Sequence, residues 1–325
     1  LTLSLGIFAI FQMYLNYIRF DNVLEFGAKY QLTGFNMNYD ICVFGGCSLD
    51  MMFYGDNNGE YHGNPDKVVP GGKAANQAVA ASRAGAKVTI ITRLGDDRIG
   101  KKILDNLEYN EVITSNVELI EGLENDSAHI YIDPITKDNQ IIRHTNASDS
   151  FSSGMVERYK DVLLNSKIIL AQLKVPKIVT EELINFCYQN NKTLIITPSH
   201  PQKLNVNEDN NKELIDKITY ITANKKECLK MFNADNVEEC ITKYPNKLIV
   251  TLGSEGVMYY NGKEIIKIPT PIVDDIKDTT GAGDTFNGHL AYGILCNLDL
   301  HQAIERAQYA AVMKIKVETA QQGIP

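Results

Sequence analysis

Short apolar runs of strand length alternate with helical patterns along most of this chain. The candidate strands are Asp40–Phe44, Lys87–Thr92, Lys167–Gln172, Thr193–Thr197, Tyr220–Thr222 and Lys247–Thr251. The candidate helices are Lys73–Arg83, Gly100–Leu107, Lys177–Gln189, Lys225–Phe232, Gly283–Cys296 and His301–Val317. This alternation predicts an α/β fold, in which a central, mostly parallel sheet is flanked by helices on both faces. Ligands of such sheets bind at the carboxyl ends of the strands, so we expect the chemistry in the loops that follow them.

Two regions interrupt the alternation. Residues 51–70 contain a Gly/Asn-rich stretch, and residues 128–145 have the pattern of a β-hairpin. We expect these two segments to form a small β-sheet lid beside the binding site. No internal repeat divides the remainder, so residues 38–325 are expected to form one domain that includes both lid segments.

The N-terminal residues differ from the rest of the chain. Residues 1–18 carry no charge and approach the length of a membrane-spanning helix. Gln12 and Asn16 weaken that interpretation, and no basic residue precedes the segment as a signal peptide requires. We therefore expect residues 1–37 to be an extension outside the fold, and membrane association is not favoured but stays open. The chain begins with Leu1 rather than Met, so we expect either a fragment or extra upstream sequence.

Composition excludes several functional classes. The formal net charge is −8 and no stretch concentrates Lys or Arg, so a nucleic-acid-binding surface is not expected. The six cysteines form no CxxC pair and no His cluster accompanies them, which argues against a zinc site. We expect reduced, mostly buried thiols in a cytoplasmic protein.

The most informative local segment is Asp278-Thr279-Thr280-Gly281-Ala282-Gly283-Asp284. Its small residues leave backbone N–H groups uncovered just before a helix, and such groups form a natural anion-binding site. Asp284 would repel a bound phosphate. Its presence makes sense if it takes a proton from a hydroxyl that attacks that phosphate. The alternative is an ordinary helix N-cap, for which Asp is a preferred residue.

A second segment is Gly71-Gly72-Lys73-Ala74-Ala75-Asn76-Gln77-Ala78-Val79-Ala80. The paired glycines permit close backbone approach, and Lys73 and Asn76 stand one helical turn apart. An ammonium and an amide on one face suit a polyhydroxylated ligand. The spacing of a Walker loop is absent. A tightly packed, Ala-rich helix with a glycine entry is the alternative interpretation.

Weaker signals follow three other candidate strands. Asp50 comes after the first strand, at its carboxyl end. Asn224 and Glu227 stand one turn apart, which suits either the ordering of water around Mg²⁺ or an N-capping box. The segment from Thr251 to Gly256 offers amides and a hydroxyl to nucleotide phosphates.

Together these segments resemble the ribokinase family of sugar and nucleoside kinases, also called the PfkB group. Gly71–Ala80 and Asp278–Gly288 are similar to its two signatures in order and separation, and the resemblance runs from about Tyr39 to Pro325. It implies a ribokinase-like α/β fold with a β-sheet lid, a homodimer formed through that lid, and the cofactors ATP, Mg²⁺ and K⁺. The implied reaction is ATP-dependent phosphorylation of D-ribose at its 5-hydroxyl, which gives ribose 5-phosphate.

The resemblance also implies a role for each matching position. Asp284 would be the general base, and the anion hole would consist of the amides of Gly281, Ala282 and Gly283. The sugar would be held by Ser48, Asp50, Gly72, Lys73, Asn76 and Asp284. The nucleotide would be bordered by Asn224, Thr251, Gly253 and Gly256. Glu227 would hold Mg²⁺ through water, and Asp278 and Thr280 would hold a monovalent cation.

Some positions depart from the family pattern. Lys174 stands where ribokinases carry a Glu that contacts the sugar, and an ammonium cannot accept a hydrogen bond from a hydroxyl. Ala74 replaces a Gly and Thr197 replaces an Asn. Residues 318–323 differ from the segment that helps to form the cation loop, and the chain stops where the family continues. The identity of the sugar and the need for K⁺ are therefore less constrained than the kinase chemistry.

Two other functions stay open. A related kinase acting on another small sugar, a sugar acid or a nucleoside is favoured by Lys174, because a cation suits an acidic sugar. A non-catalytic sugar-binding homologue is the second alternative, although Asp284 and its glycines are intact. A dinucleotide-binding oxidoreductase is not supported, since no GxGxxG follows the first strand.

Overall fold

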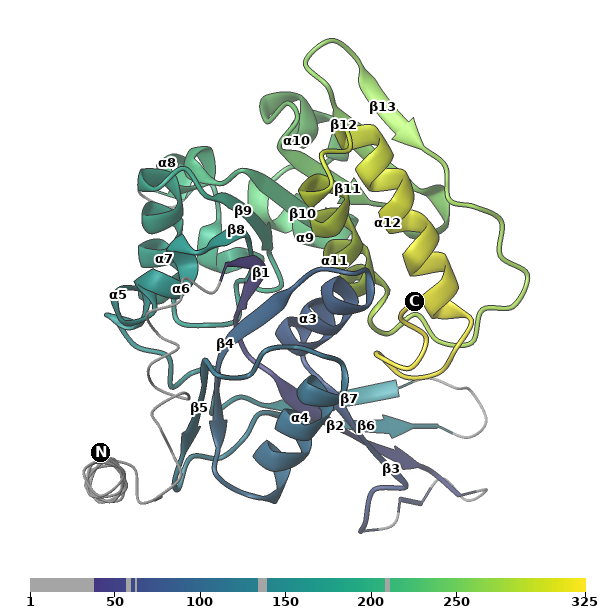
Figure 1. Ribbon diagram of the computed structural model, residues 1–325. Coiled ribbons are helices and arrows are strands. Elements are labelled where there is room, and N and C mark those ends of the chain that lie inside the picture. The colour runs from purple at the N-terminus through teal and green to yellow at the C-terminus, as the bar shows by residue number, and fades with distance from the viewer. Residues whose placement is uncertain (1–37, 57–59, 62, 134–138, 208–210) are drawn as a thin grey trace, which may run out of the picture. The chain divides into compact units, whose positions relative to one another are not determined.

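A computed structural model describes residues 38–56, 60–61, 63–133, 139–207 and 211–325 (Figure 1). The predicted extension, residues 1–37, lies outside the described residues. Parts of the two predicted lid segments, residues 57–59, 62 and 134–138, also lie outside them. Tyr39–Pro325 form one compact unit.

A large sheet of nine strands runs through the described unit in the order β13-β12-β11-β10-β9-β8-β1-β4-β5. Its strands are β1 (Tyr39–Phe44), β4 (Val88–Gly95), β5 (Val117–Ile120), β8 (Ser166–Gln172), β9 (Thr193–Thr197), β10 (Tyr220–Asn224), β11 (Leu248–Thr251), β12 (Val257–Tyr260) and β13 (Ile265–Ile268). The strands from β11 to β5 are parallel, whereas β12 and β13 pair antiparallel at one edge. The predicted mostly parallel sheet is confirmed.

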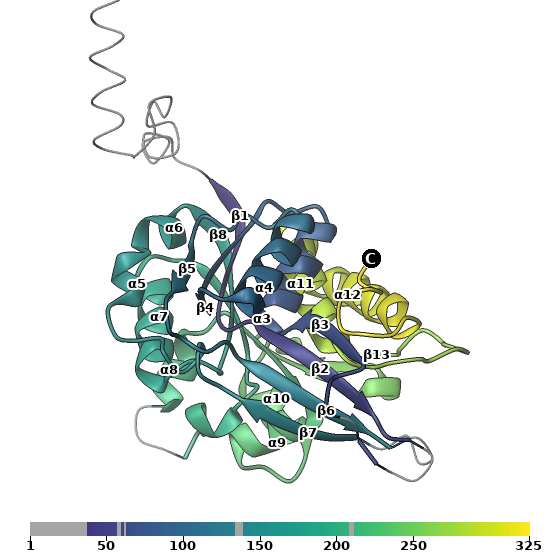
Figure 2. The ribbon, with the colours of Figure 1, turned by 90° about the horizontal axis from the view of Figure 1, so that it is seen from below.

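Helices cover both faces of this sheet, because successive side chains of each strand point to opposite sides. Ile41 and Val43 pack in one apolar cluster, while Cys42 and Phe44 pack in another. One face carries α3 (Lys73–Arg83), α4 (Arg98–Tyr109), α11 (Ala282–Leu295) and α12 (Leu300–Ile315). The other carries α5 (Met155–Arg158), α6 (Lys160–Leu164), α7 (Lys177–Gln189), α8 (Asn211–Lys217), α9 (Lys225–Phe232) and α10 (Val237–Lys243). Figure 2 shows α5, α7 and α8 on one side of the sheet and α3, α11 and α12 on the other.

A second, four-stranded sheet has the order β3-β2-β6-β7, and its strands lie together at the lower right of Figure 1. Its strands are β2 (Ser48–Tyr54), β3 (Lys67–Gly71), β6 (Ser127–Ile132) and β7 (Asn139–His144). The predicted hairpin is present as the antiparallel pair β6 and β7. The pairing register puts Asp50, Ala128 and Arg143 in one row across the sheet. These side chains therefore share one face.

The cysteines agree with the expectation of reduced, mostly buried thiols. All six cysteines are free, five of them buried and Cys296 exposed. Within the described ranges, no three His, Cys, Asp or Glu side chains converge as a metal cluster would require. None of the helices described here has the length and apolar character needed to cross a membrane.

Candidate active site

Two cavities meet at the loop that leads into α11. The larger cavity, of about 500 Å³, is lined by Thr280 and Gly281 from this loop and by Asp284 from the first turn of α11. The smaller cavity, of about 400 Å³, is lined by Thr279, Ala282 and Gly283. Neighbouring residues of one loop thus face different cavities. The loop and the first turn of α11 therefore contribute to the walls of both cavities.

Asp284 is brought to the larger cavity by close packing of α11 against α3. Gly288 makes this approach possible, because a Cβ there would lie 2.5 Å from the Cβ of Ala80 and 2.6 Å from the backbone N of Ala81. Any side chain at residue 288 would force the two helices apart. The sequence therefore fixes the distance between the two predicted signature segments.

Two side-chain amides of α3 hold the Asp284 carboxylate. Asn76 Nδ2 donates to Asp284 Oδ2 at 3.0 Å, and Gln77 Nε2 donates to Asp284 Oδ1 at 3.1 Å. Gln321 Nε2 donates to Asn76 Oδ1 at 2.9 Å, and Gln172 Nε2 donates to Gln77 Oε1 at 2.7 Å. Each amide is thus oriented by a further amide. Asp284 is only 5% exposed, and its carboxylate keeps free lone pairs to accept a proton.

The interpretation of Asp284 as an ordinary helix cap is wrong. The N-cap of α11 is Gly281, and it makes no side-chain capping hydrogen bond. Both carboxylate oxygens of Asp284 accept from α3 rather than from the first turn of its own helix. The side chain is therefore available to a ligand in the larger cavity.

The predicted anion hole lies at the N-terminus of α11. The φ angle of Gly281 is 81°, and a Cβ there would lie 2.5 Å from the carbonyl oxygen of Ala320. The first N–H groups of a helix have no carbonyl partner within it. The N–H of Ala282 donates to the Thr279 carbonyl at 3.2 Å, so one predicted amide already has a partner within the loop.

All the predicted sugar-binding residues line the larger cavity. They are Ser48, Asp50, Gly72, Lys73, Asn76 and Asp284. Asp50 is 9% exposed, and Ser48 Oγ donates to its Oδ1 at 3.4 Å. Burial raises the pKa of Asp50 to about 6, although Ser48 and the cations Lys174 and Arg143 act in the opposite direction.

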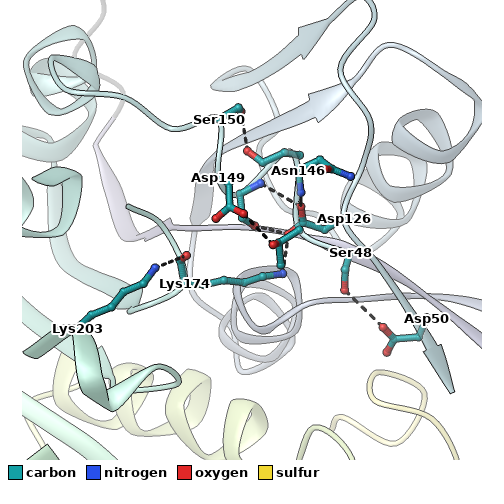
Figure 3. A network of polar contacts seen from close by, with 11 residues as sticks. Ser48, Asp50, Asp126, Asn146, Asp149, Ser150, Lys174 and Lys203 are labelled. Atoms are coloured by element: carbon teal, nitrogen blue, oxygen red, sulfur yellow. Dashed lines mark hydrogen bonds and ion pairs between the residues drawn. The ribbon is translucent and has the colours of Figure 1, made fainter. Parts of the chain in front are cut away.

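Lys174 lines the same cavity but is neutralised by a buried carboxylate. Figure 3 shows its side chain pointing toward Asp126, and Lys174 Nζ lies 2.6 Å from Asp126 Oδ2. Asp126 is fully buried and also accepts from the backbone N–H groups of Asn146 and Ser148 and from Ser148 Oγ. Lys203 Nζ donates to the Lys174 carbonyl at 2.8 Å. Lys174 is therefore part of a fixed ion pair and not a free cation.

The smaller cavity is mainly apolar and contains the predicted nucleotide-binding residues Thr251, Gly253 and Gly256. Its apolar walls are Val257, Pro271, Ile272, Val273, Ile276, Phe286, Ala311, Val312 and Ile315. Gly256 has a φ angle of 102°, and a Cβ there would lie 2.0 Å from the Ile268 carbonyl oxygen. A flat apolar ring such as a nucleobase fits a cavity of this character.

Asn224 and Glu227 form the capping box that sequence analysis left as an alternative. Asn224 Oδ1 accepts from the Glu227 N–H at 2.9 Å, and Glu227 Oε2 accepts from the Asn224 N–H at 3.0 Å. Glu227 nevertheless lines the larger cavity. Burial raises its pKa, while Lys73 lowers it. A carboxylate at the cavity wall fits a hydrated Mg²⁺ ion, which binds proteins through few direct ligands.

Asp278 and Thr280, which the sequence predicts to hold K⁺, bond to other groups of the protein. Asp278 Oδ1 accepts from the Thr280 N–H and Oδ2 from the Thr319 N–H, both at 2.8 Å. The Asp278 carbonyl accepts from Lys314 Nζ at 2.8 Å. Each of these three oxygens of Asp278 therefore already accepts one hydrogen bond from the protein. A cation bound to Asp278 would lie near this ammonium, and like charges repel.

Sequence reasoning missed several residues of the site, among them Gln77, Gln172, Gln321 and Asp126. A signal existed for Gln77, because it directly follows Asn76 in the same motif. Successive residues are rotated by only 100° about the helix axis, so both side chains can reach one group. Nothing local marks Asp126, which meets Lys174 only through the fold.

Known proteins resemble this chain over nearly its whole described length. The profile of the pfkB family carbohydrate kinases matches residues 38–325. The ribokinase of Bacillus subtilis (strain 168) is 34% identical over 290 residues, which cover 88% of this chain and 96% of that protein. The ribokinase of Lactococcus lactis subsp. lactis (strain IL1403) is also 34% identical over 290 residues, covering 88% of this chain and 93% of that protein.

Solved structures agree with the fold. The crystal structure of a ribokinase from Thermotoga maritima superposes with a TM-score of 0.76 at 27% identity, covering 88% of this chain and 96% of that chain. The structure of Arabidopsis thaliana ribokinase complexed with ribose and ATP also gives a TM-score of 0.76. It is 21% identical and covers 89% of this chain and 96% of that chain, so it supports the fold alone.

Proposed function

The chain belongs to the pfkB family of carbohydrate kinases, and we propose that it transfers the γ-phosphoryl group of ATP to the 5-hydroxyl of D-ribose. The position of Asp284 carries this proposal. Its carboxylate lines the larger cavity, while the glycine loop next to it separates that cavity from the smaller one. A base beside an acceptor cavity, and an anion-binding loop beside a nucleotide cavity, are the two parts that phosphoryl transfer needs.

The geometry supports a direct transfer. The sugar occupies the larger cavity with its primary hydroxyl toward Asp284, and the nucleotide occupies the apolar cavity with its γ-phosphate at the N-terminus of α11. The hydroxyl oxygen attacks the phosphorus while its proton passes to Asp284. The bond from the phosphorus to the bridging oxygen breaks, and ADP leaves. Amides of Gly281 and Gly283 stabilise the charge on the transferred group.

Mg²⁺ would bind at Glu227 through water and neutralise charge on the nucleotide phosphates. This assignment is supported by the position of Glu227 in the wall of the larger cavity. Asn224 acts by holding Glu227 in place, since each residue bonds to the backbone N–H of the other. We do not extend the proposal to K⁺, because the residues predicted to bind it already have protein partners.

The small sheet would act as the lid of the sugar cavity. Asp50, Ala128 and Arg143 line the cavity from this sheet. Closure of such a lid would exclude water and limit hydrolysis of ATP. The opposite face of the sheet carries Phe53 and Tyr131, whose rings stack with centroids 4.8 Å apart. We infer that this face pairs two copies of the chain into a homodimer.

The Lys174–Asp126 ion pair removes the reason that Lys174 gave for expecting a sugar acid. A carboxylate on the substrate would need a cation that is free to pair with it. Lys174 already has a fully buried partner at 2.6 Å, so its charge is offset within the protein. A neutral sugar therefore suits this part of the cavity better. The free thiols suit a reducing compartment, and we infer that the reaction takes place in the cytoplasm.

A panel of acceptors at saturating ATP tests the proposal. Ribose, 2-deoxyribose, fructose, adenosine and gluconate would be compared by the formation of ADP, with the phosphorylated position of each product assigned by ³¹P NMR. We expect the highest kcat/KM for ribose and a product phosphorylated at its 5-position. A higher kcat/KM for gluconate would show that the Lys174 ion pair opens to bind an acid. Absence of phosphorylation with every acceptor would contradict the kinase assignment itself.

A further inference from the structure

Lys314 is a buried ammonium that the proposed reaction does not use. It lies in the last turn of α12, and its side chain is 0% exposed. Lysine is almost never fully buried unless a partner offsets its charge. Its Nζ donates to the Asp278 carbonyl at 2.8 Å and lies 4.0 Å from Asp278 Oδ2. The charge of Lys314 is therefore directed at the loop that leads into α11.

Asp278 connects this loop to the C-terminal segment. Its carboxylate accepts from the N–H of Thr280 within the loop and from the N–H of Thr319 in the C-terminal segment. The N–H groups of Lys277 and Asp278 in turn donate to the Ile315 carbonyl at 2.9 and 3.2 Å. The two segments are thus joined around one carboxylate, with the ammonium of Lys314 beside it.

The same pair of segments shapes the active site. Gly281 packs directly on Ala320, since a Cβ on Gly281 would lie 2.5 Å from the Ala320 carbonyl oxygen. Gln321 holds Asn76, and Asn76 donates to Asp284. A shift of the C-terminal segment would therefore move both the anion-binding loop and the hydrogen-bonding partners of the base.

We propose that the ammonium of Lys314 takes the place of a bound monovalent cation, so that phosphoryl transfer by this chain does not need K⁺. The inference rests on the proposed kinase activity. Lys314 is a positioning residue: it supplies a fixed positive charge where a cation would otherwise join the two segments. The carboxylate and carbonyl of Asp278 are the groups that would ligate such a cation, and they bond to protein donors instead.

Replacement of the salt tests the unaltered chain. The kinase rate would be measured in about 100 mM KCl and in N-methyl-D-glucamine chloride at the same ionic strength, so that charge screening is constant. We expect rates within about twofold of each other, as required if the internal ammonium performs the role. Activation by KCl of about tenfold or more would overturn the proposal. A chain inactive in both salts would instead contradict the proposed function.

Lys314→Ala removes the ammonium and leaves room for an ion, and Lys314→Met removes the charge at nearly constant volume. We expect both variants to lose about tenfold or more of kcat without K⁺. KCl or NH₄Cl should restore a large part of the rate of Lys314→Ala but not of Lys314→Met, whose side chain fills the space. Lys316→Met is the matched control, because Lys316 is exposed on the same segment. Equal losses in Lys316→Met, or no rescue of Lys314→Ala, would contradict the proposal.

A measurement independent of catalysis is the melting temperature in the same two salts. A cation that binds only the folded state raises the melting temperature in proportion to its occupancy. We expect no K⁺-specific rise for the unaltered chain and a clear rise for Lys314→Ala. A K⁺-specific rise in the unaltered chain would show a separate cation site and overturn the inference. If neither variant folds, the response of the unaltered chain to the two salts still decides whether the chain needs K⁺.

Discussion

At the scale of single residues, the existing partners of two buried carboxylates, Asp50 and Asp126, determine which of them can accept a hydrogen bond from a ligand. Asp50 is 9% exposed, and burial raises its pKa to about 6. Asp126 is more deeply buried, but it is surrounded by Lys174 and three donors from Asn146 and Ser148. One carboxylate is therefore left for the substrate, while the other is used to fix a cation in the wall.

The raised pKa of Asp50 predicts a pH dependence of sugar binding. Below about pH 6 the carboxyl group gains a proton and loses acceptor capacity for sugar hydroxyls. We expect kcat/KM for the sugar to fall about tenfold per pH unit well below this value, because one protonation inactivates the free enzyme. The folded state holds this proton to higher pH than the unfolded chain, so the contribution of Asp50 to stability becomes less favourable as the pH rises through about 6.

The measurement is kcat/KM from pH 5 to 8, with Asp50→Asn as the comparison. The variant should bind the sugar more weakly and lack the acidic limb near pH 6. A limb that persists unchanged in Asp50→Asn would assign the titration to another group.

At the scale of elements, the contact between α3 and α11 creates the site. The predicted signature segments are far apart in the sequence. Each segment, taken by itself, has the pattern of an ordinary helix N-terminus. Gly288 lets the two helices approach so closely that Asn76 and Gln77 of α3 reach Asp284 of α11. The catalytic geometry is therefore a property of helix packing and not of one loop.

Gly288→Ala tests this dependence. The added Cβ would lie 2.5 Å from Ala80 Cβ and 2.6 Å from the Ala81 backbone N, so the helices must separate. We expect a loss of about 1–3 kcal/mol in the free energy of unfolding, measured by urea denaturation. The kcat should fall as well, because the amides move away from Asp284. Gly283→Ala is the matched control for stability, since a Cβ there meets no atom within 4 Å. Equal effects of the two changes on unfolding would contradict the packing argument.

At the scale of the whole molecule, the two sheets carry different parts of the candidate active site. The large sheet and its helices carry the proposed base, the proposed anion-binding loop and the smaller cavity, whereas strands of the small sheet line the larger cavity. The face of the small sheet that does not line the cavity includes Ile142, which is 43% exposed. If the small sheets of two copies of the chain paired, this face would be buried and each sheet would hold the other in a fixed position.

Ile142→Asp should therefore weaken self-association. A charge in the centre of a two-fold interface appears twice and is desolvated in both copies. We expect sedimentation velocity to show dimers for the unaltered chain and mostly monomers for the variant. Leu164→Asp is the control, because Leu164 is similarly exposed, at 41%, but lies on α6 outside the small sheet. A monomeric parent chain would refute the lid dimer.

The sequence was sufficient to predict the parallel sheet, its two helical layers and the β6–β7 hairpin, because strand and helix periodicities are local. It also marked Asp284 and Asn76, since these lie in compact motifs. It was not sufficient for the partners of Lys174 and Asp278. Asp126 and Lys314 approach them only through the tertiary fold, from positions that carry no local pattern. Nothing in the sequence indicated the ammonium beside the expected K⁺ ligand Asp278, because Lys314 comes from another helix.

The assignment of Asp284 as the base is tested most directly by Asp284→Asn, which keeps the size of the side chain but removes its capacity to accept the proton. The kcat would be measured at saturating ATP and ribose, with ribose affinity measured separately by calorimetry. Asp299→Asn, at the N-terminus of α12, is the control for a carboxylate-to-amide change outside both cavities. We predict that kcat falls about 10²–10⁴-fold in Asp284→Asn while ribose still binds, because the loss affects proton transfer. A variant that folds, binds ribose and keeps most of the parent kcat would show that Asp284 is not the base.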